Sequence, residues 1–180
     1  MKTFTRTIQP NSYPISLTEI RDYLRLDHNI DLSETQFLIE SAVSIAEEYT
    51  RRAFTTVTYS CLSDFMGNCF ELRYGPIQSI ESISATLNDG SVTQISPDEY
   101  YLTRATLNGQ VVFKDFKCPD DVREFEGWEV VYKCGYKVLP GALCQALKLI
   151  CAHNFEFRED KNTLPPEASR ILDAYKIVTL

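Results

Sequence analysis

The hydrophobic pattern of this chain changes its period twice. Residues 16–52 repeat apolar side chains at helical spacing, residues 55–135 break into short alternating runs, and helical spacing returns after Pro140. Helices bring every third or fourth side chain to one face, whereas strands send alternate side chains to opposite faces. The sequence therefore predicts an α+β fold: a helical bundle of two N-terminal helices and a central C-terminal helix, with an inserted antiparallel β module.

Two helices forming a hairpin are predicted within residues 1–54. Ser16 and Glu19 have the spacing of a capping box, in which each side chain hydrogen-bonds a backbone amide of the other residue. This pattern predicts a short helix within residues 16–26. A longer helix is predicted over residues 34–52, where apolar side chains form a continuous stripe along one face.

Residues 55–135 are predicted to form an antiparallel module of roughly five to seven strands. Short β-branched and aromatic runs alternate there with turn signals. The Asn108-Gly109 pair lies between two apolar runs, which is a strong hairpin signal. The last strand is expected over residues 128–134, and Gly135 ends it.

Residues 136–180 are predicted to hold a central helix and a C-terminal tail. Pro140 suits the start of a helix, and the helix that follows is apolar over most of its girth. Such a helix is expected to pack with residues 1–54 as one helical domain. The tail, residues 164–180, is also apolar and must fold back on its own core or dock on a partner. Its candidate partner-binding residues are Leu164, Pro165, Pro166, Ile171, Leu172, Tyr175 and Ile177.

The six cysteines do not have the spacing of a metal site. No two are closer than seven residues, whereas structural zinc sites use closely paired ligands. Cys144 and Cys151 lie two helical turns apart, about 10.5 Å, which is too far to share one ion. We expect reduced thiols that act mainly as small apolar side chains, with no metal and no cofactor.

The sequence contains no motif for catalysis. The two histidines, His28 and His153, lie outside any nucleophile, zinc-protease or phosphate-loop pattern. We therefore expect that the protein is not an enzyme. No apolar run approaches the roughly 18 residues that a membrane span needs, and no signal-peptide core is visible, so we expect folding in a cytoplasm without membrane association.

Acidic residues concentrate in the β module. Residues 56–135 contain twelve acidic and six basic side chains, a net charge of −6. This balance argues against a surface that grips phosphates, which needs clustered Lys and Arg. One polar segment is especially acidic, and it is either an ordinary solvated loop or an exposed contact or channel-lining loop. Its candidate residues are Asp115, Asp120, Asp121, Glu124 and Glu126.

Several segments together resemble the head-tail connector (adaptor) family of tailed bacteriophages. They occur in the family's order along nearly the whole chain. The segments are Leu24-Arg25-Leu26-Asp27, Tyr49-Thr50-Arg51-Arg52, GPIQSIESI, GYKVLPGALCQALKLICAHNFEFRED and LPPEASRILDAYKI.

This resemblance implies a structural role in the virion neck, at the capsid vertex, after assembly in the bacterial host cytoplasm. About twelve copies would close a ring through head-to-tail contacts beneath the portal protein. The ring would extend the channel, let double-stranded DNA pass without sequence-specific binding, and offer a surface to the stopper or next tail protein. The acidic loop would face the channel, and residues 164–180 would contact the portal or an adjacent subunit.

Three alternatives remain open at this point. The chain could be another ring-forming assembly protein, such as a stopper or tail terminator. It could be an enzyme that uses His153 or the acidic loop, which would require a cleft with a nucleophile and a base within hydrogen-bond reach. It could also be a host interaction domain that is stable as a monomer.

Overall fold

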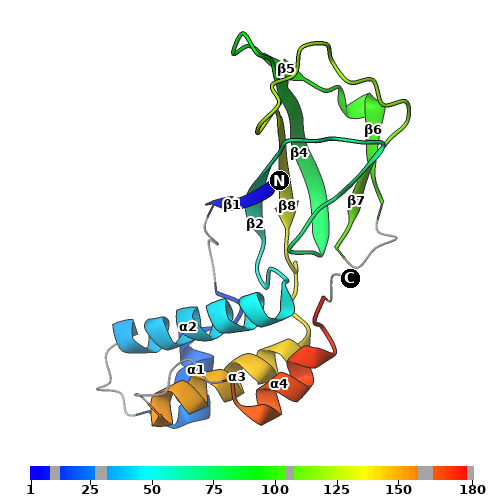
Figure 1. Ribbon diagram of the computed structural model, residues 1–180. Helices are drawn as coiled ribbons and strands as arrows, with labels where there is room; N and C mark the ends of the chain where they lie inside the picture. Colours follow the sequence, from blue (N-terminus) through cyan, green and yellow to red (C-terminus); the bar gives the residue numbers. More distant parts are fainter. Residues whose placement is uncertain (9–12, 27–31, 104–107, 158–163, 178–180) are drawn as a thin grey trace. The chain divides into compact units, whose positions relative to one another are not determined.

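The computed structural model describes residues 1–8, 13–26, 32–103, 108–157 and 164–177. The chain divides into two compact units. The β unit comprises Met1–Pro10 and Thr56–Gly135, and the helical unit comprises Asn11–Thr55 and Tyr136–Leu180 (Figure 1). Within these ranges, four α-helices and two antiparallel sheets confirm the predicted mixed α+β class.

A five-stranded antiparallel sheet forms the larger part of the β unit. Its strand order is β1-β2-β8-β4-β5. The strands are β1 (Lys2–Ile8), β2 (Val57–Ser63), β8 (Trp128–Cys134), β4 (Ile77–Thr86) and β5 (Val92–Gln94). Alternate residues of β8 are buried, as a strand with one face on the core requires.

A three-stranded sheet completes the β unit, so the predicted antiparallel module consists of two sheets. Its order is β3-β7-β6, with β3 at Cys69–Glu71, β6 at Tyr100–Thr103 and β7 at Gln110–Phe113. A short 3-10 helix, η1 (Pro97–Glu99), precedes β6. The predicted pairing of the two runs that flank Asn108-Gly109 is confirmed, because β6 and β7 pair antiparallel.

Aromatic rings connect the two sheets. Phe113 of β7 lies 5.0 Å from Phe116, and Phe116 lies 5.7 Å from Trp128 of β8, measured between ring centroids. Rings at these separations attract one another in tilted and edge-on arrangements. The chain of rings therefore fixes the segment that follows β7 against the core of the unit.

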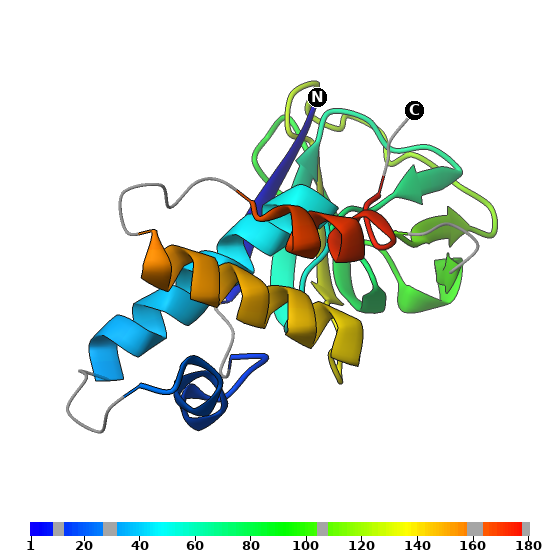
Figure 2. The ribbon, with the colours of Figure 1, turned by 90° about the horizontal axis from the view of Figure 1, so that it is seen from below.

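The helical unit contains α1 (Leu17–Leu24), α2 (Leu32–Thr50), α3 (Gly141–Glu156) and α4 (Pro166–Asp173). Ser16 caps α1 as predicted, because its hydroxyl accepts a hydrogen bond from the Glu19 amide at 3.1 Å. The Glu19 carboxylate instead pairs with Lys148 of α3 at 2.6 Å. Figures 1 and 2 show α4 alongside α3, and α3 also contacts α1 and α2.

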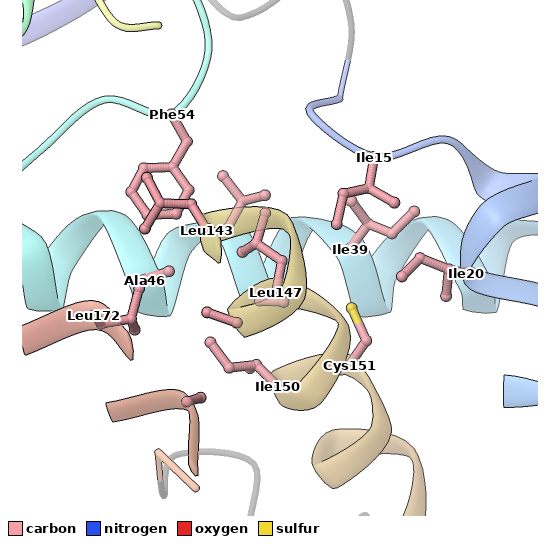
Figure 3. Packing of buried hydrophobic residues seen from close by; sticks show 14 residues of the cluster. Ile15, Ile20, Ile39, Ala46, Phe54, Leu143, Leu147, Ile150, Cys151 and Leu172 are labelled. Atoms are coloured by element: carbon pink, nitrogen blue, oxygen red, sulfur yellow. The ribbon is translucent and has the colours of Figure 1, made fainter. Parts of the chain in front are cut away.

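The core of the helical unit draws on all four helices. Figure 3 shows its apolar side chains converging between α2, α3 and α4. Cys151 belongs to this core, and its thiol donates a weak hydrogen bond to the Leu38 carbonyl at 3.6 Å. The buried members include Ile20, Ile39, Ala46, Phe54, Leu143, Leu147, Ile150 and Leu172.

The N-terminus departs from the predicted helical module. Lys2–Ile8 forms β1 and pairs with β2, so the assignment of these residues to a helical hairpin is wrong. The period of the segment explains the difference, since Thr3, Thr5 and Thr7 alternate with larger side chains, which favours a strand. The second helix also ends at Thr50, because Arg51 adopts a left-handed backbone with φ 59°.

Candidate interaction surfaces

The five carboxylates of the predicted acidic loop lie on the surface of the β unit. Asp115, Asp120, Asp121, Glu124 and Glu126 are all exposed, between β7 and β8. Asp115 pairs with Lys117 at 3.3 Å, and both side chains are about four-fifths exposed, so this pair adds little stability. The remaining charge is presented to solvent or to a partner.

Hydrogen bonds attach residues 121–126 of this loop to the β4–β5 hairpin. The Asn88 side-chain amide donates to the Asp121 carboxylate at 2.7 Å. The Arg123 amide donates to the Thr86 carbonyl at 2.9 Å, and its guanidinium donates to the carbonyls of Phe125 and Glu126. These bonds attach Asp121 and Arg123 to the β4–β5 hairpin, while the other carboxylates of the loop stay exposed.

Asp64 anchors the other end of the loop. Its carboxylate accepts a hydrogen bond from the Glu126 amide at 2.8 Å and pairs with the N-terminal amine. The Glu126 amide and then the amine hold the pKa of the Asp64 carboxyl below its usual range. The next residue, Gly127, fits only without a side chain, because a Cβ would lie 2.1 Å from the Arg123 carbonyl oxygen.

The described part of the tail packs on its own helical unit. Pro165, Leu172 and Ile177 are buried, Leu164, Ile171 and Tyr175 are half-buried, and Pro166 is exposed. Backbone contacts fix this arrangement: the Ile177 amide donates to the Thr50 carbonyl at 3.0 Å. The sequence left open whether the tail folds back on its own core or docks on a partner. In the structure, residues 164–177 fold back on the core of the helical unit.

Polar side chains add to this attachment of the tail. The Tyr49 hydroxyl donates to the Asp173 carboxylate at 2.6 Å, and the Arg52 guanidinium donates to the Tyr175 carbonyl at 2.6 Å. Lys176 lies over the Tyr49 ring, with its ammonium 4.1 Å from the centroid. Of the predicted residues, a partner can reach the exposed Pro166 and the accessible parts of the half-buried Leu164, Ile171 and Tyr175.

The cysteines divide into buried and exposed groups. Cys61, Cys134 and Cys151 are buried, Cys144 is half-buried, and Cys69 and Cys118 are exposed. Within the described ranges, no three His, Cys, Asp or Glu side chains converge as metal ligands would. Burial raises the pKa of Cys61 to about 11 and that of Cys151 to about 12.

Thiol labelling of the native protein is expected to separate these groups. At pH 8 a thiol with a pKa of about 12 is ionised to only about 10⁻⁴, and the thiolate is the reactive form. We expect Cys69 and Cys118 to react rapidly with Ellman's reagent, Cys144 slowly, and the three buried thiols only after unfolding. A Cys151→Ala variant should lower the number of reacting thiols by one in denaturant only. Rapid reaction of more than two thiols in the native protein would contradict this assignment.

The histidine that the structure describes, His153, packs against an aromatic ring. His28 lies outside the described residues. The His153 ring packs 4.9 Å from the Phe157 ring, and its buried Nε2 has no hydrogen-bond partner among the residues that the structure describes.

Among the described residues, no helix is long and apolar enough to cross a membrane.

A basic–aromatic patch, which sequence reasoning missed, lies along the β1 edge of the β unit. It comprises Lys2, Arg6 and Arg73 on the rings of Phe70, Tyr59 and Phe4. The Lys2 ammonium lies 3.7 Å from the Phe70 centroid, and the Arg73 guanidinium carbon lies 5.2 Å from the Phe4 centroid. The Arg6 guanidinium carbon lies 6.0 Å from the Tyr59 centroid.

Stacked tyrosine rings pack against one ring of this patch, that of Tyr59. The Tyr59 ring stacks on the Tyr74 ring at 4.6 Å and 10°, and on the Tyr132 ring at 6.2 Å and 20°. The alternation of Lys2, Phe4 and Arg6 along β1 was the available signal for one shared face, because alternate residues of a strand point the same way.

Comparisons with known proteins identify the fold. No protein-family model matches the chain, and no curated protein matches it in sequence. A chain from the neck of an empty gene transfer agent particle, computed with C6 symmetry, matches with a TM-score of 0.80. The match covers 99% of this chain and 97% of that chain at 18% identity.

Two further structures give the same result. A chain from the neck of the native particle, computed with C12 symmetry, matches with a TM-score of 0.80, 18% identity and coverage of 99% and 97%. A chain from the native virion matches with a TM-score of 0.77, 18% identity and coverage of 98% and 96%. The chain thus has the fold of neck components of a phage-like particle, and the resemblance to phage neck proteins inferred from the sequence is confirmed at the level of fold.

Proposed function

We propose that this chain is a structural protein of the neck of a tailed-phage-like particle, where its copies form a head-tail connector (adaptor) ring beneath the portal. The observation that carries this proposal is the match to neck chains over 99% of the sequence, including both units. The C6 and C12 symmetries of those necks favour an assembly of identical copies around one axis. A closed ring requires head-to-tail contacts between different faces of neighbouring copies.

The charge of the β unit supports a role beside passing DNA. Its acidic loop is exposed, and Asn88 and Arg123 attach the part around Asp121 to the β unit. We propose that this loop faces the channel, where negative charge repels the phosphate backbone and prevents the DNA from adhering. In this role the protein needs neither a cofactor nor a catalytic group.

Fewer tail residues are available for binding a partner than the sequence alone indicated. We propose that Pro166, with the accessible edges of Ile171 and Tyr175, contacts the portal or an adjacent subunit. Buried Leu172 and Ile177 hold α4 and the segment after it in position for that contact. The stopper or next tail protein would bind elsewhere on the assembled ring. In this proposal the ring is part of the virion and assembles in the host cytoplasm without a membrane.

Electron microscopy of the chain mixed with the portal encoded near it tests this function. We expect additional ring density directly below the portal. The control is the portal alone, imaged under the same conditions. Density that appears only when tail proteins are added, and on the tail side, would replace the adaptor assignment with a stopper or tail terminator, and a chain that joins no ring would overturn the neck assignment.

A further inference from the structure

Charge in the β unit is divided between opposite edges of its larger sheet. Lys2 and Arg6 lie on β1, at one edge, and Arg73 joins them over the Phe4 ring. The segment from β4 to β6 carries the opposite charge: residues 77–103 include four acidic side chains and no lysine or arginine. Glu81 lies on β4, Asp89 in the turn before β5, and Asp98 and Glu99 in η1. Four strand spacings of about 4.8 Å separate β1 from β5, so the two edges lie about 19 Å apart.

The acidic edge contains a recess, which we call the acidic recess. It has a volume of about 260 Å³ and is lined by residues of β4, β5, η1 and β6, with Glu81 and Glu99 at its wall. Glu81 has a partner, since Lys133 lies 3.6 Å away. Glu99 is exposed, and no cationic nitrogen within the described ranges lies within 4.0 Å of its carboxylate.

The basic–aromatic patch offers the complementary charges. In the described part of the chain, no carboxylate lies within 4.0 Å of the cationic groups of Lys2 or Arg73, although both side chains are held against aromatic rings. The Lys2 ammonium also donates a hydrogen bond to the Glu71 carbonyl at 3.1 Å, which holds it beside the Phe70 ring. Cations that are held in place lose less conformational freedom on meeting a partner carboxylate than mobile ones do.

We propose that the basic–aromatic patch of one copy binds the acidic recess of a second copy, with Arg73 and Lys2 facing Glu99 and Glu81. This inference rests on the proposed ring. The two surfaces lie at different edges of the same unit, so the contact is head-to-tail and can repeat around an axis. A symmetric contact between two basic–aromatic patches would instead place the Arg73 side chains of both copies against each other. Electrostatic complementarity therefore favours the head-to-tail contact between the patch and the recess.

Charge exchange between the two surfaces tests the contact. Arg73→Glu and Glu99→Arg should each weaken self-association, measured by sedimentation velocity at low salt, by about tenfold or more, because each places like charges in contact. The double variant should recover wild-type assembly. An equimolar mixture of the two single variants should also assemble, because each then presents the complementary surface to the other on both sides.

Matched controls separate a specific contact from a change in net charge. Lys137→Glu and Glu48→Arg make the same charge changes at exposed positions of the helical unit and should leave assembly unchanged. Near-native thermal unfolding of every variant would establish that the variants fold.

The possible negative results have different meanings. If Arg73→Glu and Glu99→Arg each self-associate as strongly as the wild type, this contact is overturned while the proposed ring remains. Loss in both single variants without recovery in the double variant or the mixture would show that the two residues do not face each other, and would also overturn it. A wild-type chain that stays monomeric at every concentration and adds no ring density to the portal would overturn both this contact and the proposed ring.

Discussion

Replacing Leu172 with alanine is expected to lower the free energy of unfolding of the helical unit by about 2–5 kcal/mol. The Leu172 side chain is completely buried in the core shared by α2, α3 and α4, in the same cluster as Ala46 (Figure 3). Truncation removes its apolar contacts and leaves a cavity, because surrounding side chains collapse only partly into the space. The loss is therefore expected without any partner present.

Urea unfolding followed by far-ultraviolet circular dichroism measures this effect, because the helices dominate that signal. Pro166→Ala is the matched control, since Pro166 also belongs to the predicted partner-binding set but is exposed. Its effect on stability should stay within about 0.5 kcal/mol, as for other surface positions. Equal stability of the Leu172 variant and the wild type would contradict the packing of α4, whereas weaker portal binding by the Pro166 variant alone would locate the contact on the exposed side of the tail.

Local sequence signals predicted the local structure well. Ser16 caps α1 through a bond to the amide three residues later, and the runs around Asn108-Gly109 pair as β6 and β7. Both features depend on residues close in the chain, whose spacing determines the geometry. Strand β1 was also readable from its alternation, but its partner β2 begins nearly fifty residues later, so local pattern alone does not indicate the pairing.

The candidate surfaces depended more strongly on long-range contacts. Exposure of the five acidic residues agrees with the composition of their loop, but the bonds from Asn88 and Asp64 that fix the loop come from distant segments. The same apolar composition of the tail fitted a core or a partner surface, and only packing separates buried Leu172 from exposed Pro166. Arg73 joins Lys2 and Phe4 only after the sheets form, which is why sequence reasoning missed the basic–aromatic patch.

Tyr132 links the core of the β unit to that patch. Its ring is completely buried and stacks on Tyr59, and its hydroxyl donates to the Arg73 carbonyl at 3.0 Å. Tyr132→Ala is expected to lower the free energy of unfolding of the β unit by about 3–5 kcal/mol, as for other buried aromatic truncations. Tyr132→Phe keeps the ring and leaves the Arg73 carbonyl without this donor, so its cost should be about 1–3 kcal/mol.

The pH dependence of unfolding separates the hydroxyl from the ring. Burial raises the pKa of Tyr132 above its usual value, so the folded β unit holds this proton more tightly than the unfolded chain does. The resulting stability is complete below the unfolded tyrosine pKa of about 10 and declines as the pH rises above it. The decline should be smaller in Tyr132→Phe, which lacks the ionisable group, although Tyr100 of the same unit still contributes because burial also raises its pKa.

Fluorescence of the single tryptophan, Trp128, reports on the β unit, because its side chain is buried in β8. Urea unfolding of the wild type, Tyr132→Ala and Tyr132→Phe at pH 7 and above pH 10 would then measure separately the contributions of the ring and of the hydroxyl to stability. A Tyr132→Phe variant with wild-type stability at pH 7 would show that the Arg73 carbonyl does not depend on this hydroxyl. If that variant instead weakens self-association more than it weakens folding, the tyrosine acts on assembly by positioning the Arg73 backbone, which connects the buried tyrosine stack to the charged contact between copies.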